Sequence, residues 1–222
     1  MLKLFAAVLL SIPLHAQAQA KRSAEDVWND LYAKREGKEH QFNKFLAEAV
    51  KGKTPGKALD IGMGQGRNSL FLAALGWDVT GFDISDVGVK QAQAEAAKRN
   101  LKLNAMVGDV DKFDYGKARY DLIVGLYMHE YLTRNAGKVV AALKPGGMLV
   151  VEGIHRDVNK DNMQGEKYGH LSNELTKVFS GLRIREYRDL VTQADWERSG
   201  GKPVPVVRLI AVKEQAARLK KQ

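Results

Sequence analysis

Three alternating glycines follow an acidic residue in the segment 58–67, which reads ALDIGMGQGR. A short apolar run ends at Asp60, and Gly62, Gly64 and Gly66 come next, before a helix-like segment. Glycines at a strand–helix turn let the backbone bend tightly and approach a ligand closely. A tight turn alone does not require three of them, so the segment predicts a ligand-binding loop.

The place of the third glycine argues against a dinucleotide site. The fingerprint G-x-G-x-x-G would need glycine at position 67, where Arg67 stands. A pyrophosphate favours an open helix N-terminus, and Asp60 would repel it. A ligand with a cationic centre and an ammonium group would instead be attracted to Asp60. A nucleotide-linked oxidoreductase is therefore the weaker alternative, and competition with NAD would test it.

Two further acidic residues follow neighbouring expected strands. Asp83 ends the segment VTGFD, 17 residues after Gly66, where a carboxylate can accept both ribose hydroxyls. Asp109 lies in VGDV, where it can accept a hydrogen bond from an adenine amine beside the Val110 backbone. Any one of these acids could instead cap a helix. Because the carboxyl ends of parallel strands share one edge of a sheet, the set predicts a site for adenosine with a cationic tail.

Strands and helices are expected to alternate through most of the chain, which predicts a parallel sheet with helices on both faces. Two strand-like segments near the end lack a helix between them and are expected to pair antiparallel. The predicted fold class is α/β, a doubly wound, Rossmann-like, mostly parallel seven-stranded sheet with a C-terminal antiparallel hairpin. The expected strands are 57–61, 77–83, 103–107, 120–126, 148–152, 183–190 and 204–213, and the expected helices are 68–75, 87–99, 133–143 and 171–179.

Two amphipathic helices are expected before the first strand. The first begins with a capping-box-like pattern at Ser23 and Asp26, and the second carries apolar residues at helical spacing from 42 to 50. Their aromatic residues are expected to cover the ligand pocket. The predicted organisation is a signal peptide at 1–20, a helical cap at 21–52 and the main domain at 53–216. The covering aromatic residues are Trp28, Tyr32 and Phe42.

The motifs LDIGMGQG, VTGFD, VGDV, YDLIVGL and LKPGGMLVVEG together resemble the class I S-adenosylmethionine-dependent methyltransferases over residues 25–213. The stretch from motif one to motif two looks most like small-molecule enzymes of the tellurite-resistance and thiopurine type. The resemblance implies S-adenosylmethionine as cofactor and a small-molecule methyl acceptor. It also implies roles in cofactor binding for Asp60, Gly62, Met63, Gly64, Gly66, Asp83, Ile84, Asp109, Val110 and Gly125.

Methyl transfer by in-line displacement needs an oriented nucleophile in a dry pocket, and a general base only if that nucleophile arrives protonated. The catalytic candidates are Tyr127 and His129 after the fourth expected strand, and His155 after the fifth. Either histidine could instead be a packed core residue. The fourth motif reads Gly125-Leu-Tyr-Met without prolines, unlike nucleic-acid amino-methylating enzymes, and Gly125 cannot ligate the metal of catechol-type enzymes.

Composition excludes several other classes of protein. The 222 residues include no cysteine, and the five histidines form no metal-binding pair, so disulfides and a zinc site are not expected. The formal net charge of +9 is spread along the chain, which favours a solvated basic surface. A nucleic-acid-binding module is the alternative that this charge leaves open, and salt-dependent RNA binding would support it. No apolar run is long enough for an ordinary membrane span, so stable membrane insertion is not expected.

Residues 1–20 have the layout of a secretory signal peptide. Lys3 precedes an apolar run of 11 residues from position 4 to position 14, and two A-x-A cleavage sites follow it. The expected location is therefore periplasmic or secreted, and the alternative is an apolar N-terminal helix of a cytoplasmic protein. Since S-adenosylmethionine is made in the cytosol, an exported protein that binds this cofactor or S-adenosylhomocysteine without transferase activity is an alternative function.

Overall fold

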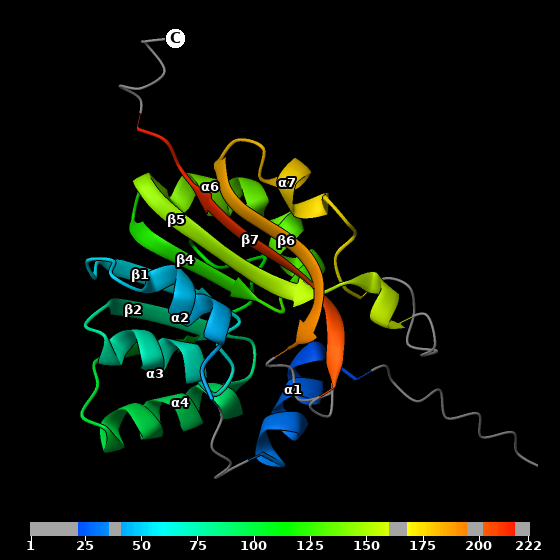
Figure 1. The fold of residues 1–222 in the computed structure, drawn as a ribbon. Helices are drawn as coiled ribbons and strands as arrows, with labels where there is room; N and C mark the ends of the chain where they lie inside the picture. The colour runs from blue at the N-terminus through cyan, green and yellow to red at the C-terminus, as the bar shows by residue number, and fades with distance from the viewer. Residues whose placement is uncertain (1–21, 36–40, 160–167, 195–201, 216–222) are drawn as a thin grey trace, which may run out of the picture.

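The structure is a computed structural model that describes residues 22–35, 41–159, 168–194 and 202–215. Its centre is one seven-stranded sheet in the order β3-β2-β1-β4-β5-β7-β6 (Figure 1). Strands β1 to β5 run parallel, and β7 pairs antiparallel with both β5 and β6, which confirms the predicted fold class. The strands are β1 (Lys57–Ile61), β2 (Asp78–Asp83), β3 (Leu103–Val107), β4 (Tyr120–Leu126), β5 (Leu143–Ile154), β6 (Arg183–Gln193) and β7 (Pro203–Val212).

Helices cover both faces of the sheet because its central strands are apolar on both sides. One face packs on α2 (Lys44–Val50), α3 (Arg67–Ala74) and α4 (Asp86–Lys98), with a core around Leu72 and Leu122. The other packs on α5 (His129–Arg134), α6 (Ala136–Ala142) and α7 (Glu174–Val178), with a core around Leu132 and Leu149. The strand order reverses between β1 and β4, and open α/β sheets bind their ligands at such a point.

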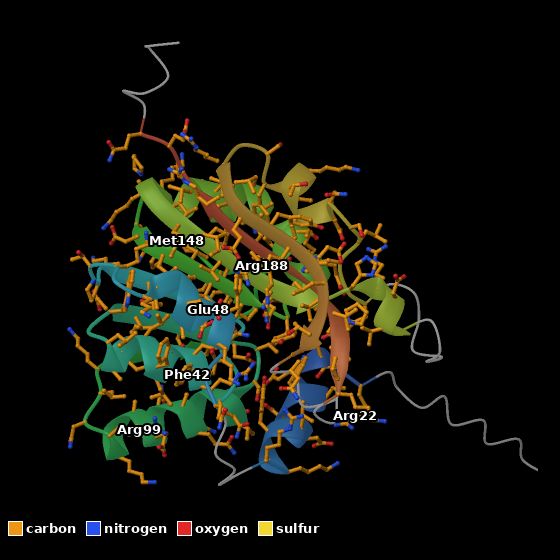
Figure 2. The ribbon with its side chains drawn as sticks, viewed as in Figure 1. Arg22, Phe42, Glu48, Arg99, Met148 and Arg188 are labelled. Atoms are coloured by element: carbon orange, nitrogen blue, oxygen red, sulfur yellow. The ribbon has the colours of Figure 1, made fainter. Side chains whose placement is uncertain are left out.

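The N-terminal helix α1 (Ala24–Ala33) lies against α4 at the carboxyl edge of the sheet (Figure 1). The predicted capping box is present, since the Ser23 hydroxyl accepts from the Asp26 N–H at 3.0 Å and the Asp26 carboxylate accepts from the Ser23 N–H. Figure 2 shows Phe42 beside α3, where its ring stacks on Phe71 at 4.1 Å. The predicted signal peptide lies outside the described residues.

Two predicted elements differ from the structure. The single helix expected at 133–143 is two helices, α5 and α6, which meet at Asn135 because its side chain bonds Asp111 and the Tyr131 carbonyl. Strand β5 begins at Leu143, where a strand was expected from 148, and absorbs the Pro-Gly-Gly turn as an irregularity in its pairing with β4. A short 3₁₀ turn (Arg156–Asn159) follows β5. Among the described residues, no helix has the length and apolar character needed to cross a bilayer.

Candidate functional site

The glycine loop between β1 and α3 adopts a backbone that other residues rarely take. Gly62, Gly64 and Gly66 have φ values of 67°, 56° and 79°, in the left-handed region where a Cβ is strained. Gly66 is also the N-cap of α3 and supplies no side-chain cap, so the first-turn N–H groups keep no side-chain acceptor there. The loop therefore turns tightly at the edge of the sheet, where the Met128 and Tyr32 side chains lie against Gly62 and Gly64.

Asp60 lies at the base of this loop with almost no solvent contact. It is 2% exposed, and the Ser69 hydroxyl donates to its Oδ2 at 2.7 Å. Burial raises the pKa of Asp60 to about 6, whereas the Ser69 hydrogen bond and the nearby Arg67 charge act in the opposite direction. The Asp60 carboxylate is thus poised to gain a cationic partner.

Asp83 ends β2 and points back at the same loop. Its two carboxylate oxygens accept N–H groups from Gly64 and Ser85, each at 2.9 Å. Burial raises the pKa of Asp83, and these two backbone hydrogen bonds oppose that rise. Each oxygen retains a lone pair that a ligand hydroxyl could use. Asp60 and Asp83 are close enough for the charge of Asp83 to raise the pKa of Asp60, so the structure brings the two predicted acids together.

Helix α1 covers the loop beside this pair of acidic residues. A Cβ at Gly64 would lie 2.6 Å from the Tyr32 hydroxyl oxygen, and one at Gly88 would lie 2.9 Å from the Tyr32 ring. Asn29 accepts a hydrogen bond from the Ser85 hydroxyl at 2.5 Å, directly after Asp83. Tyr32 therefore lies where the sequence analysis expected an aromatic cover.

The structure also describes the surroundings of the other residues that were predicted to contact the cofactor. The Met63 side chain packs against Gly81 and Ser69. Its N–H donates to the Phe82 carbonyl of β2 and its carbonyl accepts from the Gly66 N–H, so Met63 offers a ligand little polar contact. Asp109 follows β3, and its Oδ1 accepts the Asp111 N–H at 2.8 Å in a local turn. Ile84 is half-buried beside Asp83, and Val110 is buried in the core.

The end of β4 carries an unusual backbone. Tyr127 and His129 have φ values of 60° and 40°, which are strained for residues with side chains and are frequent at functional sites. Gly125 is required for packing, because a Cβ there would lie 2.8 Å from the Leu132 side chain. The structure therefore assigns Gly125 a contact with α5 and leaves only its backbone for a ligand.

Tyr127 belongs to a buried network around Glu152, a residue that the sequence analysis missed. The Tyr127 hydroxyl donates to Glu152 at 2.5 Å, and Asn43 and Arg208 each donate to the same carboxylate at 2.6 Å. Glu152 is fully buried, and the Arg208 guanidinium also lies 5.0 Å from the Phe45 ring centre. The sequence signal for Glu152 was a charged residue inside the otherwise apolar segment MLVVEG.

The two histidine candidates follow the ends of β4 and β5. His129 is 1% exposed, its Nε2 accepts the Ile154 N–H at 3.3 Å, and burial lowers its pKa to about 3. Its ring centre is 5.3 Å from that of His170, which the sequence analysis missed because only folding brings it there. His155 has its Nδ1 bonded to the Asp157 N–H and its Nε2 3.3 Å from the Ser172 hydroxyl.

Comparison with known proteins identifies relatives of this chain. The family described as tellurite resistance protein TehB matches residues 25–195. The chain is 35% identical over 89 residues to the probable S-adenosyl-L-methionine-dependent methyltransferase TehB of Haemophilus influenzae, covering 40% of this chain and 31% of that relative. It is 30% identical over 190 residues to the ubiquinone biosynthesis O-methyltransferase of Coxiella burnetii, covering 80% of this chain and 77% of that relative.

Solved structures agree on the fold. TehB from Haemophilus influenzae aligns with a TM-score of 0.66 at 22% identity, covering 84% of this chain and 67% of that one. The chain thus spans about a third of the length of the curated TehB relative and two thirds of the solved TehB chain.

The fold and the site together identify the chain as a class I S-adenosylmethionine-dependent methyltransferase. The chain belongs to the TehB family within that class, since the family match covers most of its length. S-adenosylmethionine is the cofactor that this family implies, and the buried carboxylates beside the glycine loop fit its ammonium and ribose groups. Within the described part of the chain, no cluster of side chains could hold a metal ion.

Proposed function

We propose that the protein transfers the methyl group of S-adenosylmethionine to a small-molecule acceptor by in-line displacement. The observation that carries this proposal is the buried Asp60 carboxylate, which lies with Asp83 at the left-handed backbone turns of Gly62, Gly64 and Gly66. S-adenosylmethionine, when bound, supplies an electrophilic methyl group on a cationic sulfur. The protein contributes binding, orientation and exclusion of water.

Each residue around the loop takes a separate part of the cofactor in this proposal. Asp60 receives the ammonium group, because a nearby cation favours its ionised form. The glycine backbone lies beside the carboxylate and ribose, and Asp83 accepts the ribose hydroxyls. Asp109 and Val110 lie beside adenine at the end of β3.

The acceptor binds near the ends of β4 and β5, where the backbone strain at Tyr127 and His129 is concentrated. The name of the Coxiella relative, a ubiquinone biosynthesis O-methyltransferase, supports an oxygen acceptor for this chain. The segment after β4 lacks the prolines of nucleic-acid amino-methylating enzymes, which supports a small molecule over a nucleic acid.

An acceptor screen tests this function. The full chain is incubated with labelled S-adenosylmethionine and a panel of phenols, thiols and tellurite, and S-adenosylhomocysteine formation is measured. Acceptor-dependent product that disappears in the Asp60→Asn variant is expected. Tight cofactor binding without product from any acceptor would favour a binding protein without transferase activity.

We also propose that the protein is exported from the cytoplasm. Residues 1–20 combine Lys3, an apolar run and two A-x-A sites, which supports export to the periplasm or beyond. Fractionation of the native host with mass spectrometry of the N-terminus tests this. We expect a chain that begins at Lys21 outside the cytoplasm, and an uncleaved chain in the cytoplasm would contradict export.

A further inference from the structure

Glu152 is a fully buried charged residue near the carboxyl end of β5, and the proposed methyl transfer does not use it directly. Its carboxylate accepts hydrogen bonds from Tyr127, Asn43 and Arg208. Burying a carboxylate is costly even when it is paired, so its presence in an apolar strand calls for a reason. Two of its partners lead to residues 62–68, which comprise the glycine loop and the start of α3. We call residues 62–68 the cofactor loop.

Tyr127 connects Glu152 to the start of the cofactor loop. The Tyr127 N–H donates to the Glu152 carbonyl at 2.6 Å, and the Tyr127 hydroxyl donates to the Glu152 carboxylate at 2.5 Å. These two bonds hold Tyr127 at a φ of 60°, which is strained for a residue with a side chain. The next residue, Met128, packs on Gly62 so closely that a Cβ there would overlap the Met128 Sδ. The backbone turn at Tyr127 therefore determines where Met128 meets the loop.

Asn43 connects Glu152 to the other end of the cofactor loop. Its side-chain amide donates to Glu152 at 2.6 Å, and its backbone N–H donates to the side-chain oxygen of Asn68 at 2.9 Å. Asn68 lies in the first turn of α3, where Arg67 also donates to the Gln41 carbonyl at 3.0 Å. Asn43 is itself fully buried and caps α2, which lies beside α3 on the same face of the sheet (Figure 1). The end of the loop is thus tied to the same carboxylate as its start.

We propose that Glu152 is a positioning residue for the cofactor, because its carboxylate holds both ends of the cofactor loop in place. Tyr127 transmits this restraint through Met128 to Gly62, and Asn43 transmits it to the first turn of α3. A loop that is ordered before the cofactor arrives loses less conformational entropy on binding, which favours affinity. This inference rests on the proposed methyltransferase function and adds to its site a residue that acts through others.

The positioning role needs an acceptor oxygen at position 152 rather than a charge. Tyr127 and Asn43 both donate to Oε1 of Glu152, whereas Arg208 donates to Oε2. A glutamine side chain keeps an acceptor in place of Oε1 but brings a donor amide against Arg208. Replacing Arg208 with an apolar residue removes that conflict. In this background, glutamine and leucine at position 152 differ mainly in whether the acceptor is present.

Two double variants separate positioning from folding. The glutamine variant is Glu152→Gln with Arg208→Leu, and the leucine variant is Glu152→Leu with Arg208→Leu. Calorimetric titration with S-adenosylhomocysteine is expected to give a dissociation constant within about threefold of the wild type for the glutamine variant, and about tenfold weaker binding for the leucine variant. Urea denaturation verifies that both variants are folded under the conditions of the titration.

The Tyr127→Phe variant tests whether the restraint passes through the Tyr127 hydroxyl. In the wild-type background, we expect it to weaken S-adenosylhomocysteine binding about fivefold. Added to the leucine variant, it should cause no further loss, because its acceptor is already absent there. Tyr187→Phe is the matched control, since it removes a phenol oxygen that accepts the Asn173 N–H at 2.6 Å beside β6, and it should bind normally.

Methionine methyl NMR spectra of the free protein supply a readout that a general loss of stability would not move. The Met128 signal, assigned with Met128→Leu, is expected to shift in Tyr127→Phe and in the leucine variant. It should stay at the wild-type position in the glutamine variant, because the acceptor for Tyr127 is kept. Met106, on the edge strand β3, is the internal control and should not shift in any of them.

The outcomes distinguish this inference from the proposed function. If the wild type binds S-adenosylhomocysteine and both Tyr127→Phe and the leucine variant bind it equally well, the inference is overturned and the methyltransferase function stands. A glutamine variant that binds as weakly as the leucine variant, or a Met128 signal that does not move in Tyr127→Phe, would also overturn the inference. Failure of the folded wild type to bind S-adenosylhomocysteine would refute the proposed function and the inference together.

Discussion

Cofactor binding should depend on pH through Asp60. Burial raises the pKa of this carboxyl to about 6, and the cofactor ammonium would bind its ionised form. The ionised fraction falls from nearly complete at pH 7.5 to about a tenth at pH 5, so the dissociation constant for S-adenosylhomocysteine should rise about tenfold over this range. Binding at pH 5 should release about 0.9 proton, and binding at pH 7.5 almost none.

Calorimetric titration in buffers of different ionisation enthalpy measures both quantities. The Ser69 hydrogen bond lowers the pKa of Asp60, so Ser69→Ala should move the transition to higher pH. Asp60→Asn should bind more weakly and show no transition of this kind. Asp83 and Arg67 are the other charges that act on Asp60, and the Asp60→Asn variant keeps both. A dissociation constant that stays flat from pH 7.5 to pH 5 in the wild type would refute the role of Asp60.

Three further predictions follow from the geometry of the site. Gly64→Ala should weaken S-adenosylhomocysteine binding more than about tenfold, because φ is 56° and the new methyl group would meet Tyr32, whereas Gly181→Ala, which has open space around it, should bind normally in the same titration. Glu152→Gln should lower the free energy of unfolding in urea by about 3 kcal/mol, because it leaves Arg208 buried without its counter-charge, and adding Arg208→Met should recover most of that loss. Since burial lowers the pKa values of His129 and His170, the unfolded chain binds more protons than the folded chain as the pH falls through 6.5. Urea denaturation should therefore show about 2 to 3 kcal/mol of unfolding free energy lost per histidine by pH 4.5, and His129→Phe should flatten this dependence.

Sequence patterns predicted the parts of the protein that depend on local order. The strand–glycine–helix segment, the acidic end of β2 and the antiparallel end of the sheet all lie where they were expected. Their signals are short in sequence, since glycines at positive φ and apolar runs of strand length act within a few residues. The capping box at Ser23 is also a signal that acts within a few residues.

Long-range contacts account for what the sequence did not reveal. His170 reaches the site only because its backbone pairs beside Ile154, and Glu152 matters because Asn43, from the N-terminal cap, arrives at its carboxylate. The break between α5 and α6 depends likewise on Asp111, which lies 24 residues from Asn135. No local sequence pattern indicates these contacts, so only the folded structure reveals them.

We propose that the loop between Asp60 and Gly66, closed by Asp83, binds the cofactor of a methyltransferase. Calorimetric titration of the full chain with S-adenosylhomocysteine at pH 7.5, beside the Asp83→Asn variant, tests it most directly. We expect one-to-one binding by the wild type and at least about tenfold weaker binding by a variant that remains folded. No binding by the folded wild type, or equal binding by both proteins, would contradict it.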